Sequence, residues 1–204
     1  TPIAVMRMIL QEEDTRQNRE LLAELFRIEQ YAEMALSYIR LESRESDFVI
    51  KEYNLDDIIR QAIHRYAPQF IRRKLRLVYE PTEVKVLTDE KWLLFILEQI
   101  ISNAVKYTPE GGQIRVSVES WEMYVKIDIT DTGIGISEQH QGAIFKRFYR
   151  EDIVHDVDGI GIGLYLAREI VTLQGGYIRV TSEVGKGSTF SVFLLREQSK
   201  YAEE

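Results

Sequence analysis

Asp131-Thr-Gly133-Ile-Gly135 directly follows Tyr124 to Thr130, whose alternating apolar and polar residues predict a β-strand. Three further clusters accompany it: Asn103-Ala-Val-Lys106-Tyr107, Gly159-Ile-Gly161-Ile-Gly163-Leu164 and Gly185-Lys-Gly187-Ser-Thr189-Phe190. Because glycine makes up about 7% of an average protein, Asp-x-Gly-x-Gly and Gly-x-Gly-x-Gly are each expected fewer than about 0.1 times in such a chain. One cluster alone fits a tight turn, whereas all four in this order indicate a binding site.

The first two of these clusters along the chain suit an adenine base and a magnesium ion. An ionised carboxylate only accepts hydrogen bonds, so a buried Asp131 would accept the exocyclic amine of adenine and reject a keto purine. Gly133 and Gly135 remove side chains where the base must come close. Asn103 offers a neutral oxygen for Mg²⁺, which keeps most of its waters and takes few protein ligands.

Two features predict contacts to phosphate groups. Lys106 lies one helical turn after Asn103, so it faces the same way and can reach a phosphate. The segment 159–163 leads into a predicted helix, 163–174, whose free N–H groups and dipole favour anions. The sequence contains neither the Gly-Lys-Ser/Thr of a Walker A loop nor a strand–Gly-x-Gly-x-x-Gly–helix unit, which excludes those two folds.

The segment 144–158 predicts a lid over the phosphates, because its second half is polar and ends in glycines. In this interpretation Arg147 or Arg150 supplies charge to the γ-phosphate. The alternative is a loop that Phe145 and Phe148 anchor in the core, and both can hold, since a hinged lid needs an apolar anchor.

Length and composition narrow the class of protein. The chain has 204 residues, a formal net charge of -7 and no cysteine, which excludes a disulfide scaffold and disfavours a general nucleic-acid binder. Its longest apolar run is far shorter than the roughly 20 residues needed to span a bilayer. Since the chain starts at Thr1, we expect it to be part of a longer protein.

The N-terminal stretch predicts a helical hairpin. Apolar residues recur in steps of three and four over 21–39 and again over 3–10, with a polar turn at 11–19. Two such helices cannot bury their apolar stripes alone, so a symmetric dimer that forms a four-helix bundle is the simplest solution. The alternative is that the hairpin packs on the rest of the same chain.

The remainder predicts an α/β fold, a two-layer sandwich with a mixed sheet and helices on one face. The domain boundaries expected are 1–46 for the hairpin and 47–204 for the sandwich. Helices are expected from Leu55, over 89–107 and over 163–174, and strands over 48–53, 76–80, 83–87, 114–120, 124–130, 177–182 and 189–195.

The four clusters resemble the N, G1, G2 and G3 boxes of bacterial sensor histidine kinases of two-component systems, and Phe145 to Arg150 resembles their F box. The resemblance covers nearly the whole chain and implies the Bergerat fold, with ATP and Mg²⁺ as cofactors. It assigns Mg²⁺ binding to Asn103, the F-box role near the γ-phosphate to Arg150, and nucleotide contacts to Asn103, Lys106, Tyr107, Asp131, Gly133, Gly135, Ile136, Gly159, Gly161, Gly163, Leu164 and Thr189.

Thr1-Pro2 resembles the end of the family's H box, which places the phosphoacceptor histidine four residues upstream of Thr1. Thr1 would then position water for dephosphorylation of a response regulator. His64, His140 and His155 lack the right context and are expected to be ordinary packing or surface residues.

The resemblance also implies partners. They are a second copy through residues 1–46, a response regulator receiver domain and, for the intramembrane-sensing subgroup, a membrane transporter, with no nucleic acid. The full protein would be anchored in the bacterial membrane with this part in the cytoplasm.

Gln99 separates kinases from ATPases within this superfamily. In the hydrolysing relatives a glutamate four residues before the asparagine acts as general base, and an amide cannot take a proton from water. We therefore expect phosphoryl transfer to a histidine rather than rapid hydrolysis. Two alternatives stay open: a nucleotide-gated pseudokinase that acts through contacts, and a serine kinase of the anti-sigma type.

Overall fold

The computed structural model describes residues 2–42, 48–149, 159 and 161–196. The chain divides into two compact units, Thr1–Asp47 and Phe48–Glu204, here called the helical unit and the sandwich unit. No helix in the described parts of the chain is long and apolar enough to cross a membrane.

The helical unit is a hairpin of α1 (Pro2–Gln11) and α2 (Arg16–Glu42). Its turn is shorter than the sequence predicts, because Thr15 caps α2: its hydroxyl accepts a hydrogen bond from the Asn18 N–H at 3.1 Å. The polar residues after Thr15 therefore form helix surface. An ion pair between Arg7 and Glu29 joins the two helices.

The sandwich unit is built on a five-stranded sheet of order β2-β4-β5-β7-β6. Its β2 pairs parallel with β4, and all other neighbours are antiparallel. A separate pair, β1 and β3, forms a small antiparallel sheet. The strands are β1 (Lys51–Asn54), β2 (Arg76–Tyr79), β3 (Lys85–Thr88), β4 (Gln113–Ser120), β5 (Tyr124–Asp131), β6 (Tyr177–Glu183) and β7 (Gly187–Leu195).

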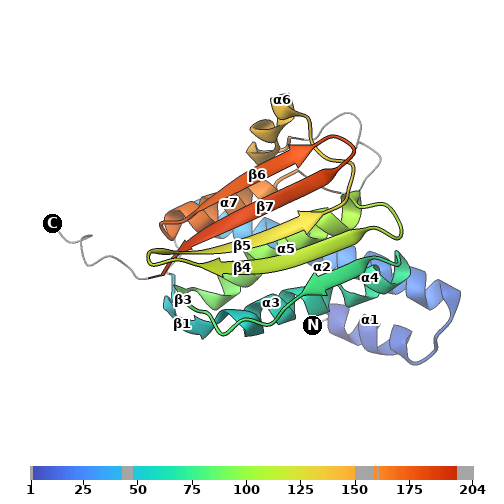
Figure 1. Ribbon diagram of the computed structural model, residues 1–204. Helices are drawn as coiled ribbons and strands as arrows, with labels where there is room; N and C mark the ends of the chain where they lie inside the picture. Colours follow the sequence, from blue (N-terminus) through green and yellow to red (C-terminus); the bar gives the residue numbers. More distant parts are fainter. Residues whose placement is uncertain (1, 43–47, 150–158, 160, 197–204) are drawn as a thin grey trace. The chain divides into compact units, whose positions relative to one another are not determined.

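The long helices of this unit cover one face of the sheet, as Figure 1 shows. Asn54 and Asp89 cap α3 and α5, each with a side-chain oxygen that accepts N–H groups of the first turn. The sequence did not predict the short elements α4, α6 and η1. The helices are α3 (Leu55–Arg65), α4 (Ala67–Arg72), α5 (Glu90–Tyr107), α6 (Glu138–Gln141) and α7 (Gly163–Leu173), with a 3₁₀ turn η1 (Ala143–Phe145).

The core lies between α5 and the sheet. Along β5 every second residue is buried, and α5 contributes fully buried apolar residues such as Ile100. Each such side chain stabilises the fold by about 2 kcal/mol. The predicted α/β two-layer sandwich is confirmed, and the end of α5 lies beside the end of β5.

Candidate nucleotide site

Asp131 is the last residue of β5, and its side chain is only 6% exposed. The Gly133 N–H donates to Asp131 Oδ1 at 2.8 Å, so the carboxylate is held in a fixed orientation. Burial raises the pKa of the Asp131 carboxyl, and the backbone amides of Gly133 and Ser188 partly oppose that shift. The result is a buried, oriented hydrogen-bond acceptor.

The glycines after Asp131 are required by the protein's own backbone. A Cβ on Gly133 would lie 2.6 Å from both Asp131 Oδ1 and the Tyr107 carbonyl oxygen. Gly135 has φ +72°, and a Cβ there would overlap the backbone of Glu183. Close contact with α5 and with the β6–β7 turn is thus one reason for glycine at these two positions, and room for a base stays a prediction.

Two hydrogen bonds from backbone N–H groups tie the loop after Asp131 to α5 and to β6. The Ile134 N–H donates to the Tyr107 carbonyl at the end of α5, at 3.2 Å. The Ile136 N–H donates to the Ser182 hydroxyl on β6, at 2.7 Å. The loop after Asp131 is therefore fixed relative to the end of α5, which carries the Asn103 cluster.

The Asn103 cluster and Gln99 lie on α5, where three of their side chains form one stripe. Gln99, Asn103 and Lys106 are spaced by four and three residues, so they share a helix face, and all three are half-buried. A Cβ on Gly163 would lie 2.5 Å from Gln99 Oε1, and one on Gly159 would lie 3.9 Å from Lys106 Nζ. The structure thus brings the third glycine cluster against this stripe.

Gly163 and Leu164 begin α7, and within the described residues no side chain caps that first turn. Gly161, with φ +78°, packs against the backbone of Phe148 and Tyr149. The first N–H groups of a helix have no partner within the helix, so this turn is suited to phosphate oxygens. A carboxylate, an amide, a lysine and a helix N-terminus therefore line one region of the sandwich unit.

Comparison with known proteins shows the family of this chain. Residues 88–198 match the family described as Histidine kinase-, DNA gyrase B-, and HSP90-like ATPase. The chain belongs to this family.

Its relatives include sensor kinases. The chain is similar to the sensor protein kinase PmrB of Pseudomonas aeruginosa, 28% identical over 97% of this chain and 43% of that protein. It is 30% identical to the sensor protein BceS of Halalkalibacterium halodurans, over 97% of this chain and 59% of that protein. The chain thus spans about half the length of these relatives.

Two solved structures share the fold over nearly all of this chain. The histidine kinase AdeS of Acinetobacter baumannii matches 97% of this chain and 96% of its own, with TM-score 0.71 and 18% identity. The histidine kinase ThkA in complex with response regulator protein TrrA matches 98% and 58%, with TM-score 0.68 and 18% identity.

The strand register places the side chains of Thr189 and Asp131 on opposite faces of the sheet. Asp131 pairs with Ser188 and Thr130 pairs with Thr189, and successive residues of a strand point to opposite faces. The Thr189 hydroxyl bonds to the Thr130 hydroxyl at 2.9 Å on the far face. Ser188 pairs directly with Asp131, and its hydroxyl bonds to the Ser182 hydroxyl at 2.8 Å.

The F-box region of the sandwich unit has one apolar anchor rather than two. Phe145 is buried and packs edge-on against Phe190, with ring centroids 6.3 Å apart. Phe148 is 63% exposed with φ +58°, so its proposed role as a core anchor is wrong. Arg147 donates to the Tyr165 hydroxyl at 2.7 Å. Predictions for Thr1, Arg150, His155 and the rest of the segment 150–158 lie outside the described residues.

Glu98, next to Gln99, points away from the site. Its buried carboxylate pairs with Arg65 of α3 at 3.0 Å. Among the residues that the structure describes, no group of three or more His, Asp or Glu side chains could hold a metal ion. The amide oxygen of Asn103 stays the predicted protein ligand for Mg²⁺, an ion that takes few protein ligands and keeps several waters.

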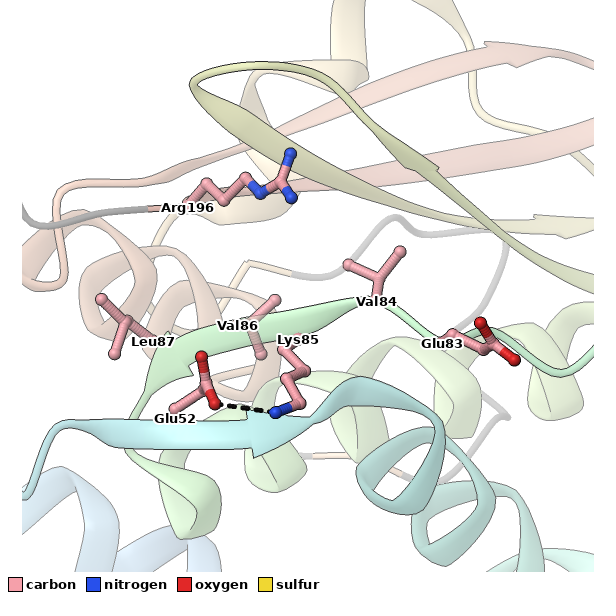
Figure 2. Close-up of a pocket in the computed structure, with 7 residues that line it drawn as sticks. All are labelled: Glu52, Glu83, Val84, Lys85, Val86, Leu87 and Arg196. Atoms are coloured by element: carbon pink, nitrogen blue, oxygen red, sulfur yellow. Dashed lines mark hydrogen bonds and ion pairs between the residues drawn. The ribbon is translucent and has the colours of Figure 1, made fainter.

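A cavity of about 540 Å³ lies elsewhere in the sandwich unit. Figure 2 shows Lys85 and Glu52 paired across β3 and β1 inside it, with Arg196 on the β7 side. Arg196 follows Leu195, which pairs with Tyr124 at the opposite end of β5 from Asp131. At about 3.3 Å per residue the two ends are roughly 23 Å apart, so this cavity is separate from the candidate nucleotide site.

Proposed function

We propose that this chain binds Mg-ATP and acts as the kinase core of a sensor histidine kinase. The γ-phosphoryl group passes to a histidine and then to an aspartate of a response regulator. One observation carries the nucleotide proposal: a buried carboxylate, Asp131, is fixed by backbone amides next to the stripe of α5 that holds Asn103 and Lys106.

Each group has a distinct role. Asp131 accepts the exocyclic amine of adenine, and Ser188 lies beside it. Lys106 and the first N–H groups of α7 bind phosphate oxygens, and Asn103 Oδ1 would bind Mg²⁺. The ion, when bound, neutralises charge on the β- and γ-phosphates.

The transfer itself needs position more than acid–base chemistry. The bond from the γ-phosphorus to the ADP oxygen breaks while a bond to a neutral imidazole nitrogen forms, and ADP leaves with the electron pair. Gln99, which lies against Gly163, cannot activate a water as a carboxylate would. We therefore expect transfer to a histidine to be favoured over hydrolysis.

The helical unit supports a dimer in this proposal. Eight large apolar side chains of the hairpin are exposed in a single copy, and a second hairpin would cover them in a four-helix bundle. They are Val5, Met6, Met8, Ile9, Leu21, Ile28, Leu36 and Ile39. A response regulator is the proposed partner, as TrrA is for ThkA. We further propose that the protein dephosphorylates this regulator through Thr1, that it has a membrane anchor and that a membrane transporter is a second partner.

Labelling with γ-³²P-ATP tests the kinase reaction. The test uses a polypeptide extended upstream of Thr1 to include the predicted acceptor histidine. We expect acid-labile, alkali-stable label on that histidine, lost on its change to glutamine, and passed on to a receiver domain. Nucleotide binding without any label would favour the pseudokinase, and phosphoserine on a partner would favour the serine kinase.

A further inference from the structure

Arg73 stands at the C-terminal end of α4, and its side chain reaches the last turn of α5. The guanidinium donates to the carbonyl oxygens of Val105, of Lys106 at 2.9 Å and of Thr108 at 2.8 Å. The last carbonyls of a helix have no partner within the helix, and a cation there also interacts favourably with the helix dipole.

The carbonyl that Arg73 leaves out is used by the Asp131 loop. Tyr107 O accepts the Ile134 N–H at 3.2 Å. Four successive carbonyls, 105 to 108, are therefore held from outside α5: three by one guanidinium and one by the loop. Lys106 and Tyr107, two predicted nucleotide contacts, lie within this stretch. The bonds to its carbonyls therefore hold both residues in a fixed position.

The backbone turn that ends α4 fixes the position of Arg73. Lys74 has φ +51°, and the Leu75 N–H bonds to Phe70 O at 2.9 Å while the Lys74 N–H bonds to Ile71 O at 3.1 Å. This pattern is a Schellman motif that ends α4. The Gly111 N–H donates to Arg73 O at 3.1 Å, which ties the turn after α5 to the same residue.

We propose that Arg73 is a positioning residue for the nucleotide site, acting through the end of α5 on Lys106. The inference rests on the proposed nucleotide binding. A lysine at this position keeps the charge but lacks the planar fork of five N–H donors, so it cannot hold three separate carbonyls in one geometry.

The test compares Arg73→Lys with Lys74→Met, a neighbouring change that removes only an exposed ion pair with Glu110. Binding of a non-hydrolysable ATP analogue with Mg²⁺ is measured by calorimetry. We expect Arg73→Lys to weaken binding about tenfold, about 1.4 kcal/mol, and Lys74→Met to leave it unchanged. Circular dichroism checks that Arg73→Lys is folded.

A double-mutant cycle with Lys106→Met distinguishes positioning from general destabilisation. If Arg73 acts through Lys106, Arg73→Lys has little further effect on affinity in the Lys106→Met background. An equal loss in both backgrounds, or unchanged binding by folded Arg73→Lys, would overturn the inference. Failure of the parent chain to bind the analogue would instead overturn the proposed function.

Discussion

The helical unit and the sandwich unit bury their apolar residues to very different degrees. In the described part of the helical unit only Leu25 and Met34 are buried, whereas the sandwich unit has a continuous core between α5 and the sheet. Apolar burial is the main favourable term in folding, so the second unit has a sufficient core of its own and the first does not. The difference supports the proposal that a second copy covers the apolar residues of the helical unit.

The largest expected effect comes from a core residue of the sandwich unit. Ile100→Ala removes a fully buried side chain from α5, and we expect a loss of about 3 to 4 kcal/mol in unfolding free energy. Ile39→Ala, the matched change at an exposed site of α2, should cost under about 1 kcal/mol when it is made in the Ile28→Glu variant, which we expect to be monomeric. Urea unfolding monitored by circular dichroism measures both, and equal losses would remove the contrast between the units.

The next prediction concerns association of the helical unit. Ile28→Glu places a charge on an exposed apolar stripe of α2, so we expect a dimer to become a monomer. Sedimentation equilibrium reports the mass. Met123→Glu, an equally exposed change in the β4–β5 turn, is the control and should stay dimeric. A monomeric parent chain, or a dimer that survives Ile28→Glu, would contradict this part of the account.

A smaller effect distinguishes two ion pairs of the sandwich unit. Arg65→Ala removes the ion pair between Arg65 and the buried Glu98 carboxylate, which we expect to cost about 2 to 3 kcal/mol. Lys74→Ala breaks a pair whose side chains are both largely exposed, so solvent screens the pair and we expect a much smaller loss of stability. Thermal unfolding of both variants measures the difference; similar shifts would mean that the burial of Glu98 carries no energetic weight.

The smallest predicted effect is a gain in stability at the site itself. Burial raises the folded-state pKa of Asp131, so the buried charge costs stability above that pKa, and the cost is relieved as pH falls through it. Asp131→Asn removes the charge, and we expect a higher Tm than the parent at pH 7. The difference should shrink as the pH approaches the raised pKa, and a lower Tm at pH 7 would contradict it.

Residues with local signals were predictable from the sequence. The alternation of 114–120 and 124–130 predicted the strands β4 and β5, because each has one buried face. The apolar run before Asn103 predicted α5, and Asn54 predicted the start of α3. Short α4, with Pro68 in its first turn, carried too little periodicity to be found.

Other features depend on contacts that the sequence does not display. Thr189 and Ser188 are neighbours, and only the pairing register decides which one shares a face with Asp131. Arg73 lies more than 30 positions from the carbonyls that it holds, with no local pattern to link them. Phe148 is exposed and has a positive φ, and its residue type indicates neither.

Nucleotide binding tests the central claim most directly. Calorimetric titration with a non-hydrolysable ATP analogue and Mg²⁺ is run on the parent chain, on Asp131→Asn and on Asp128→Asn, the same change on the opposite face of β5, where Asp128 pairs with Lys126 at 2.8 Å. We expect binding by the parent and by Asp128→Asn, and a loss of at least about tenfold in Asp131→Asn. Equal affinity of all three proteins, or no binding by the parent, would contradict the account.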